Sequence, residues 1–154
     1  MGSWGVKALE SDEGLDILYE FRNYCVENDK VIIGDLIEYF KEIGLLPKNS
    51  EEIDFLYDKT VMALAELLKE YNEKGEMVVG YKDGGEKAVE EKVTDLMFNR
   101  EDIDYLINQI TNILEPKGEV HETYELWKDS KNFSKWEEHV RSLLAVLKGI
   151  KDNL

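Results

Sequence analysis

Apolar residues recur every three or four positions along most of this chain, which is the spacing of a helix face turned away from water. The pattern predicts helices that start near Ser11, near Asp35, between residues 49 and 53, near Asn99, near His121 and near Ser134. The inward positions predicted for the first three helices are Leu15, Leu18, Phe21 and Cys25, then Leu36, Phe40 and Ile43, then Ile53, Leu56, Val61, Leu64, Leu68 and Tyr71. In the later helices they are Ile103, Leu106, Ile110 and Ile113, then Trp136, Val140, Leu143, Leu147 and Ile150.

Capping and breaking residues define the helix ends. Three pairs have the spacing of a capping box, in which a polar side chain and an acidic residue three positions later satisfy each other's backbone amides. These pairs are Asn49 with Glu52, Asn99 with Asp102, and Ser134 with Glu137. Glycine and proline end the predicted helices at Gly44 and Pro47, before Gly75, and at Pro116 and Gly118.

Residues 76–92 do not follow the helical period. "MVVGY" has the composition of a strand and "DGG" is typical of a turn, so this stretch is predicted to form either a small hairpin or an ordered loop. We find no internal repeat and no linker between domains. The prediction is an all-α or nearly all-α fold, a compact bundle of about six helices in which residues 1–154 form a single domain.

The chain is strongly acidic, with a formal net charge of −15 spread along its length. Such a charge repels phosphate backbones and anionic lipid surfaces, so we expect no nucleic-acid and no membrane partner. A basic protein partner fits the charge. With neither a basic–apolar leader nor a long apolar run, the expected location is the cytoplasm.

Few residues suit metal or nucleophilic chemistry. Cys25 is the single cysteine, and its apolar neighbours predict a core thiol. His121 and Glu125 in "HETYE" are spaced to share a helix face, but a third ligand would have to come from elsewhere. We therefore expect neither a metal nor a cofactor.

The two ends of the chain resemble a bacterial protein family catalogued as domain of unknown function 4259. The opening residues that match are Met1, Gly2, Trp4, Gly5, Ser11, Asp12 and Asp16. The matching residues near the other end are Glu122, Leu126, Trp127, Asp129, Trp136, Val140, Leu143 and Leu147. His121 and Thr123 depart from the family pattern. The resemblance implies a shared fold and no particular chemistry.

Five of these residues are candidates for contact with a partner: Trp4, Asp12, Asp16, Glu122 and Trp127. Each also has a structural interpretation. The acidic residues suit capping and the first turn of a helix, and the tryptophans suit the core. We predict that "GSWG" forms an anchoring arm in which Trp4 plugs the core.

The leading functional hypothesis is a non-enzymatic module that binds or inhibits another protein, in the manner of an immunity or antitoxin protein. The motive is the strong negative charge together with the lack of a recognisable catalytic set. The alternative is a carboxylate-based hydrolase or small-ligand-binding protein with a helical cleft. A deep pocket with close carboxylates and a histidine would favour the enzyme, and a shallow acidic face would favour the binder.

Overall fold

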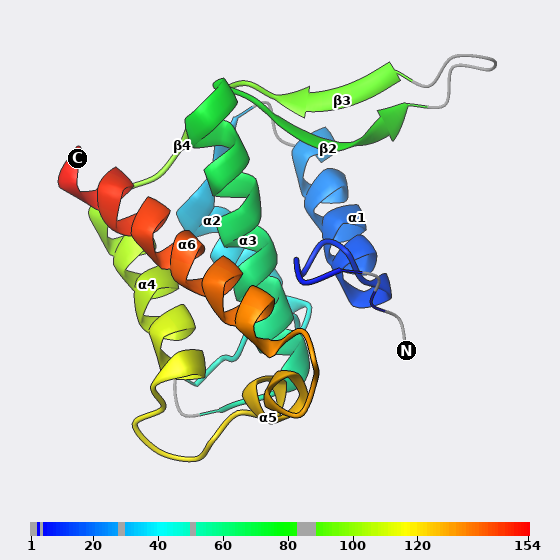
Figure 1. Ribbon diagram of the computed structural model, residues 1–154. Helices are drawn as coiled ribbons and strands as arrows, with labels where there is room; N and C mark the ends of the chain where they lie inside the picture. The colour runs from blue at the N-terminus through cyan, green and yellow to red at the C-terminus, as the bar shows by residue number, and fades with distance from the viewer. Residues whose placement is uncertain (1–2, 4, 28–29, 50–51, 83–88) are drawn as a thin grey trace.

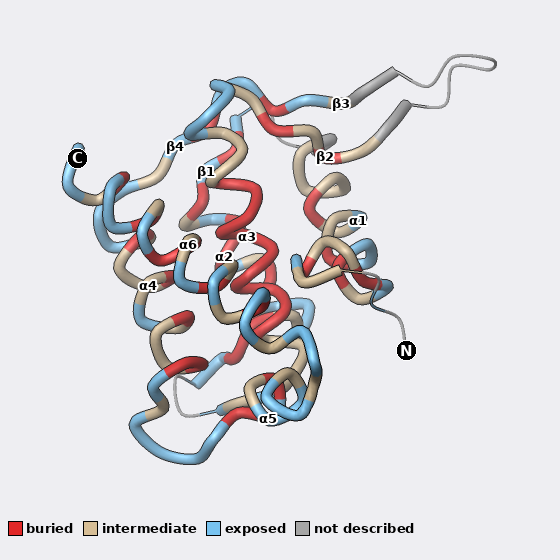
Figure 2. The backbone as a smooth tube through the Cα atoms, in the orientation of Figure 1, coloured by how far each residue is buried: buried red, intermediate tan, exposed pale blue. Residues whose placement is uncertain are grey.

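A long central helix, α3 (Phe55–Lys74), organises the molecule (Figure 1). The computed structural model describes residues 3, 5–27, 30–49, 52–82 and 89–154. Within these residues, α3 is buried continuously from Asp58 to Leu68, as Figure 2 shows in red. Helices α1, α4, α5 and α6 and strand β2 all contact it. A helix enclosed on every side is expected to be apolar around its whole circumference, and "VMALAELL" nearly is.

The ends of α3 confirm one expectation and correct another. The helix stops at Gly75, whose φ of 72° is a left-handed conformation that glycine adopts without strain. At the other end the N-cap is Asp54, whose side chain accepts a hydrogen bond from the backbone N–H of Leu56. The predicted capping box of Asn49 and Glu52 is therefore wrong, because the helix begins a full turn later.

Helices α4 (Arg100–Leu114) and α6 (Phe133–Asp152) pack against each other and against α3. All nine of their predicted inward residues are buried. The capping box of Asn99 and Asp102 is confirmed. The box of Ser134 and Glu137 is wrong, since α6 starts after Asn132. Phe133 packs near the Tyr124 and Trp136 rings, which draws it into the first turn of α6.

The first two helices are present, but part of their predicted core faces water. In α1 (Asp12–Glu27), Ile17 and Phe21 are fully buried, whereas Leu15 is 49% exposed. Of the four predicted inward residues, Phe21 is buried, Leu18 and Cys25 are half-buried against the core, and only Leu15 is wrong. Ile17 is buried in its place, on the side of the helix where Gly14 lies against the backbone of Ala8 and Leu9. Helix α2 (Ile33–Glu42) ends before Ile43, which is 41% exposed and not in the core.

Of the two predicted alternatives for residues 76–92, the described residues show the strands of a hairpin. Strand β2 (Met77–Lys82) pairs antiparallel with β3 (Val89–Val93), and β2 contacts α1 and α3 (Figure 1). The "DGG" turn lies outside the described residues. A second pair was not predicted: β1 (Val31–Ile32) runs parallel to β4 (Leu96–Met97). Two-residue strands carry too little pattern to be seen in a sequence.

The short helix α5 (Glu122–Lys128) contacts α3, α4 and α6 and completes a compact, mostly helical protein. Among the described residues there are six helices and only short strands, which confirms the predicted fold class. No helix in this part of the chain combines the length and the apolar character needed to cross a bilayer.

The described part of the N-terminal arm, Ser3 and residues 5–11, is seated on the helices. Ala8 is buried, and its carbonyl accepts a hydrogen bond from Ser11 Oγ, which in turn accepts one from the backbone N–H of Gly14. Ser11, rather than Asp12, therefore caps the N-terminus of α1. Trp4, the predicted plug, lies outside the described residues.

Candidate functional site

A surface cleft lies where the start of α3, the end of α4 and the loop between α4 and α5 meet. It consists of two adjoining hollows with volumes of about 660 Å³ and about 320 Å³. Ile53 and Glu119 line both of them, so the two hollows lie side by side, and we refer to them together as the cleft.

We call the smaller hollow the acidic lobe. Its lining includes five carboxylates, Asp54, Asp58, Glu119, Glu122 and Glu125, together with Ile53, Phe55, Val120 and His121. Glu119, Glu122 and Glu125 are exposed and form no ion pair with any described residue. No lysine or arginine belongs to the described lining of this lobe. The lobe is therefore a region of uncompensated negative potential, which attracts cations.

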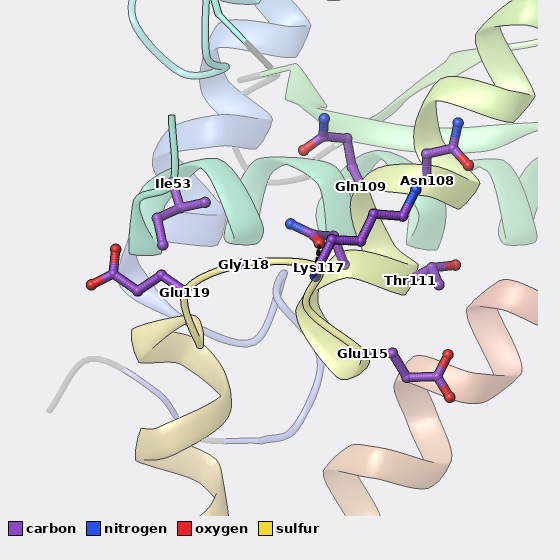
Figure 3. A pocket seen from close by; sticks show the side chains of 9 residues that line it. Ile53, Asn108, Gln109, Thr111, Glu115, Lys117, Gly118 and Glu119 are labelled. Carbon is purple, nitrogen blue, oxygen red and sulfur yellow. Dashed lines mark hydrogen bonds between the residues drawn. The ribbon is translucent and has the colours of Figure 1, made fainter. Parts of the chain in front are cut away.

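We call the larger hollow the amide lobe. Side chains of α4 line one side of it, among them Asn108, Gln109 and Asn112, and the α4–α5 loop closes the other side (Figure 3). Figure 3 shows Lys117 rising from this loop toward the middle of the lobe. The backbone N–H of Lys117 donates a hydrogen bond of 3.0 Å to Asn112 Oδ1, which fixes the loop to the helix.

A buried pair, Asp58 and His121, lies at the edge of the acidic lobe. His121 Nδ1 is 2.9 Å from Asp58 Oδ2, and Thr123 Oγ1 donates to the same oxygen at 2.7 Å. His121 Nε2 is 3.0 Å from Asn112 Nδ2. Both ring nitrogens and the carboxylate are thus engaged within the protein, as buried polar groups usually are.

The spacing of His121 and Glu125 predicts that they share a helix face, but in the structure they lie in different environments. His121 is the N-cap residue of α5 and is only 3% exposed, whereas Glu125 is exposed. Neither ring nitrogen of His121 is free to bind a metal ion in this arrangement. Within the described residues, no group of three or more histidine, cysteine, aspartate or glutamate side chains is placed to hold a metal.

The second histidine forms another buried pair. His139 Nε2 is 2.8 Å from Glu66 Oε2, which also accepts a hydrogen bond of 2.7 Å from the backbone N–H of Ala8. Glu66 Oε1 accepts from the N–H of Leu9 at 2.9 Å. Three donors therefore compensate a buried carboxylate, and two of them belong to the N-terminal arm. The role of this pair is to hold the arm against α3 and α6.

Lys59 lies on the same buried side of α3. Burial lowers the pKa of its ammonium group, and the nearby charges of Glu13 and Glu66 oppose that change. Its Nζ is 3.4 Å from Ser3 Oγ and 5.2 Å from the centre of the Phe55 ring. Lys59 contributes to seating the arm and is not part of the cleft lining.

The structure does not gather the five predicted contact residues into one site. Glu122 lies in the acidic lobe. Trp127 is half-buried on α5, where its ring stacks on that of Trp136 with 5.9 Å between centroids. Asp12 and Asp16 are exposed on α1, with Asp12 in its first turn. Trp4 is not among the described residues.

Sequence reasoning missed Asp58, Glu66, Asn112 and His139. The signal that could have revealed two of them is a charged residue on the predicted inward side of an apolar helix. Glu66 interrupts "VMALAELL", and Asp58 lies three residues before Val61. Such residues are buried only when they are paired. The sequence does not name the partners, which lie 63 and 73 residues away along the chain.

The fold and the cleft define a mostly helical protein with an acidic surface hollow. The profile of one protein family, described as Domain of unknown function (DUF4259), matches residues 2–139. The chain belongs to this family, which confirms the resemblance seen in its end motifs. No curated protein and no solved structure matches the chain.

Proposed function

We propose that this protein is a non-enzymatic binding protein of the bacterial cytoplasm, and that its acidic lobe receives a basic segment of another protein. The observation that supports this is a set of exposed carboxylates, Glu119, Glu122 and Glu125, that form no ion pair with a described residue and surround a hollow without a described basic lining residue. Repulsion among such carboxylates is relieved when a cation binds. The net charge of −15 adds long-range steering of a basic partner.

A carboxylate-based hydrolase is the second candidate, and the geometry favours it less. A general base needs a ring nitrogen or carboxylate oxygen that can reach a substrate proton. Asn112 occupies His121 Nε2, and both His121 and Thr123 occupy Asp58. A hydrolase would therefore have to use the exposed carboxylates of Glu119, Glu122 or Glu125 without a free histidine nitrogen beside them.

The test compares two variants of equal net charge. Glu122→Gln with Glu125→Gln removes two of the five carboxylates of the acidic lobe, while Glu73→Gln with Glu138→Gln removes the same charge from exposed positions on α3 and α6. The probe is a fluorescein-labelled oligolysine peptide, and its dissociation constant is measured by anisotropy at low ionic strength. A charge pair in water contributes about 1 kcal/mol at contact, and two carboxylates are removed. We therefore expect the lobe variant to bind between about fivefold and about 30-fold more weakly than the control variant.

Equal weakening of both variants would contradict the proposal, because it would mean that the peptide responds to the overall charge alone. Addition of salt should weaken binding to the wild type, as for any interaction between exposed charges. Circular dichroism of each variant confirms that the helices are intact.

A further inference from the structure

In the hydrogen bonds around Asn112, the donor and the acceptor of each bond can be assigned. The backbone N–H of Lys117 can only donate, so the Asn112 atom facing it is the acceptor Oδ1. The amide NH₂ of Asn112 therefore faces His121 Nε2, which must accept. The ring proton of His121 is then on Nδ1, where it is donated to Asp58. The arrangement fits only a neutral His121.

Protonation of His121 breaks this arrangement. A proton on Nε2 would place two donors, Nε2–H and the Asn112 NH₂ group, 3.0 Å apart. Rotation of the Asn112 amide by half a turn restores a hydrogen bond to His121. The same rotation turns the NH₂ group toward the Lys117 N–H and so removes the acceptor that holds the loop.

We propose that Asn112 couples protonation of His121 to the position of the α4–α5 loop, so that the cleft releases a cationic ligand as the pH falls. The release step rests on the function proposed above, whereas the coupling between His121 and the loop does not. The loop contributes Lys117, Gly118 and Glu119 to the lining of the cleft, so its movement changes both lobes.

Charged groups of several elements surround His121. Asp58 contacts its ring, and the other charged groups lining the acidic lobe are carboxylates of α3, the loop and α5. With the amide lobe included, the charged residues lining the cleft are Asp54, Asp58, Glu115, Lys117, Glu119, Glu122 and Glu125.

Two effects then act in the same direction on a bound cation. The imidazolium adds a positive charge beside the acidic lobe, and the loop that carries Glu119 is no longer tied to α4 through Asn112. Because coupling between two binding events is reciprocal, a bound cation should also make His121 harder to protonate.

The experiment follows the free protein by nuclear magnetic resonance, without any ligand. The nitrogen shift of His121 Nε2 and the amide signal of Lys117 are recorded from about pH 8 to about pH 5, where histidine ordinarily changes charge. We expect His121 to start as the Nδ1–H tautomer and both signals to change with one midpoint. His139 serves as the internal reference, because its described hydrogen-bond partner is Glu66 and not an amide side chain.

Asn112→Asp provides the decisive variant. An aspartate accepts from both Lys117 N–H and a protonated His121, so the donor conflict disappears. We expect the His121 midpoint to rise by about one pH unit or more, as for a histidine beside a new carboxylate, and the Lys117 signal to become insensitive to pH. Asn108→Asp is the matched control, since it adds the same charge to the amide lobe without contacting His121 in any described hydrogen bond.

Binding of the oligolysine peptide is then measured at about pH 7.5 and about pH 5.5. We expect the wild type and Asn108→Asp to bind at least about fivefold more weakly at the lower pH, the lower end of ordinary coupling. The Asn112→Asp variant should lose most of this pH response.

The coupling is overturned if Lys117 stays unchanged while His121 titrates, if Nε2 already carries its proton at pH 8, or if His121 does not titrate above pH 5. If the peptide binds at neither pH, the proposed function and the release step fail together. The Lys117 response still decides the coupling in that case.

Discussion

Replacing Gly14 with alanine tests how the N-terminal arm is seated on α1. By helix propensity alone, Gly14→Ala should stabilise the protein, since alanine is favoured over glycine within a helix by about 0.5–1 kcal/mol. The structure predicts the opposite. A Cβ atom at Gly14 would lie 1.9 Å from the carbonyl oxygen of Ala8 and 2.8 Å from the Cα of Leu9. Both are backbone atoms, so the arm itself must move.

The cost follows from the bonds that the arm makes. Ala8 and Leu9 donate their backbone N–H groups to the buried carboxylate of Glu66 at 2.7 and 2.9 Å. Hydrogen bonds to a charged group contribute about 1.5–3 kcal/mol each. Loss of both, less the gain in helix propensity, predicts a decrease of about 2–5 kcal/mol in the free energy of unfolding. For a chain of this size that corresponds to a melting temperature lower by roughly 4–20 °C.

The measurement is urea unfolding followed by circular dichroism, with Gly149→Ala as the matched control. Gly149 is an exposed position of α6, and a Cβ there meets no atom within 4 Å. The same substitution should therefore stabilise the protein at residue 149 and destabilise it at residue 14. If Gly14→Ala is as stable as the wild type or more so, the seating of the arm on α1 and Glu66 is refuted.

Two further predictions concern α4 and α1. Asn99→Ala should lower the free energy of unfolding by about 1 kcal/mol, because it removes the side chain that caps α4; Ser134→Ala, at a predicted cap that the structure does not use, should change it far less. Burial raises the pKa of the Cys25 thiol from 9.0 to about 12, so the native protein should react slowly with iodoacetamide at pH 8 and rapidly only after unfolding. The thiol of Cys25 therefore ionises at a higher pH in the folded protein than in the unfolded chain. The free energy of unfolding is unaffected by this thiol below about pH 9 and decreases as the pH rises from about 9 toward 12, because only the unfolded chain then gains the thiolate. The loss should be smaller in Cys25→Ser, and an equal loss in both proteins would contradict this account.

The helices themselves were readable in the sequence because their signals are local. In α4, a capping box precedes four apolar residues at helical spacing, and all four are buried. Gly75 ends α3 because a left-handed residue is needed there, and glycine adopts that conformation most easily. The end motifs also identified the family correctly. The helix signals depend on residues within a few turns of one another, and each end motif is likewise short.

The inward face of α1 could not be read in the same way. Its sequence allows the predicted stripe of Leu15, Leu18, Phe21 and Cys25, or a face turned slightly so that Ile17 is buried instead of Leu15. The second was realised, because the arm packs on Gly14, one turn before Ile17, while Leu18, Phe21 and Cys25 still contact the core. Periodicity gives the spacing of a face, and the packing partner decides which of two adjacent faces is buried.

The candidate site was decided by tertiary structure almost entirely. The sequence determined that the chain is acidic, helical and without a recognisable catalytic motif, and it singled out Glu122, which does line the acidic lobe. It did not reveal that Asp58 meets His121, or Glu66 meets His139, across 63 and 73 residues. A buried charge must find a partner, but the chain can supply that partner from any segment that folding brings close. Which carboxylates are paired inside and which remain free in the cleft is therefore a property of the packed structure alone.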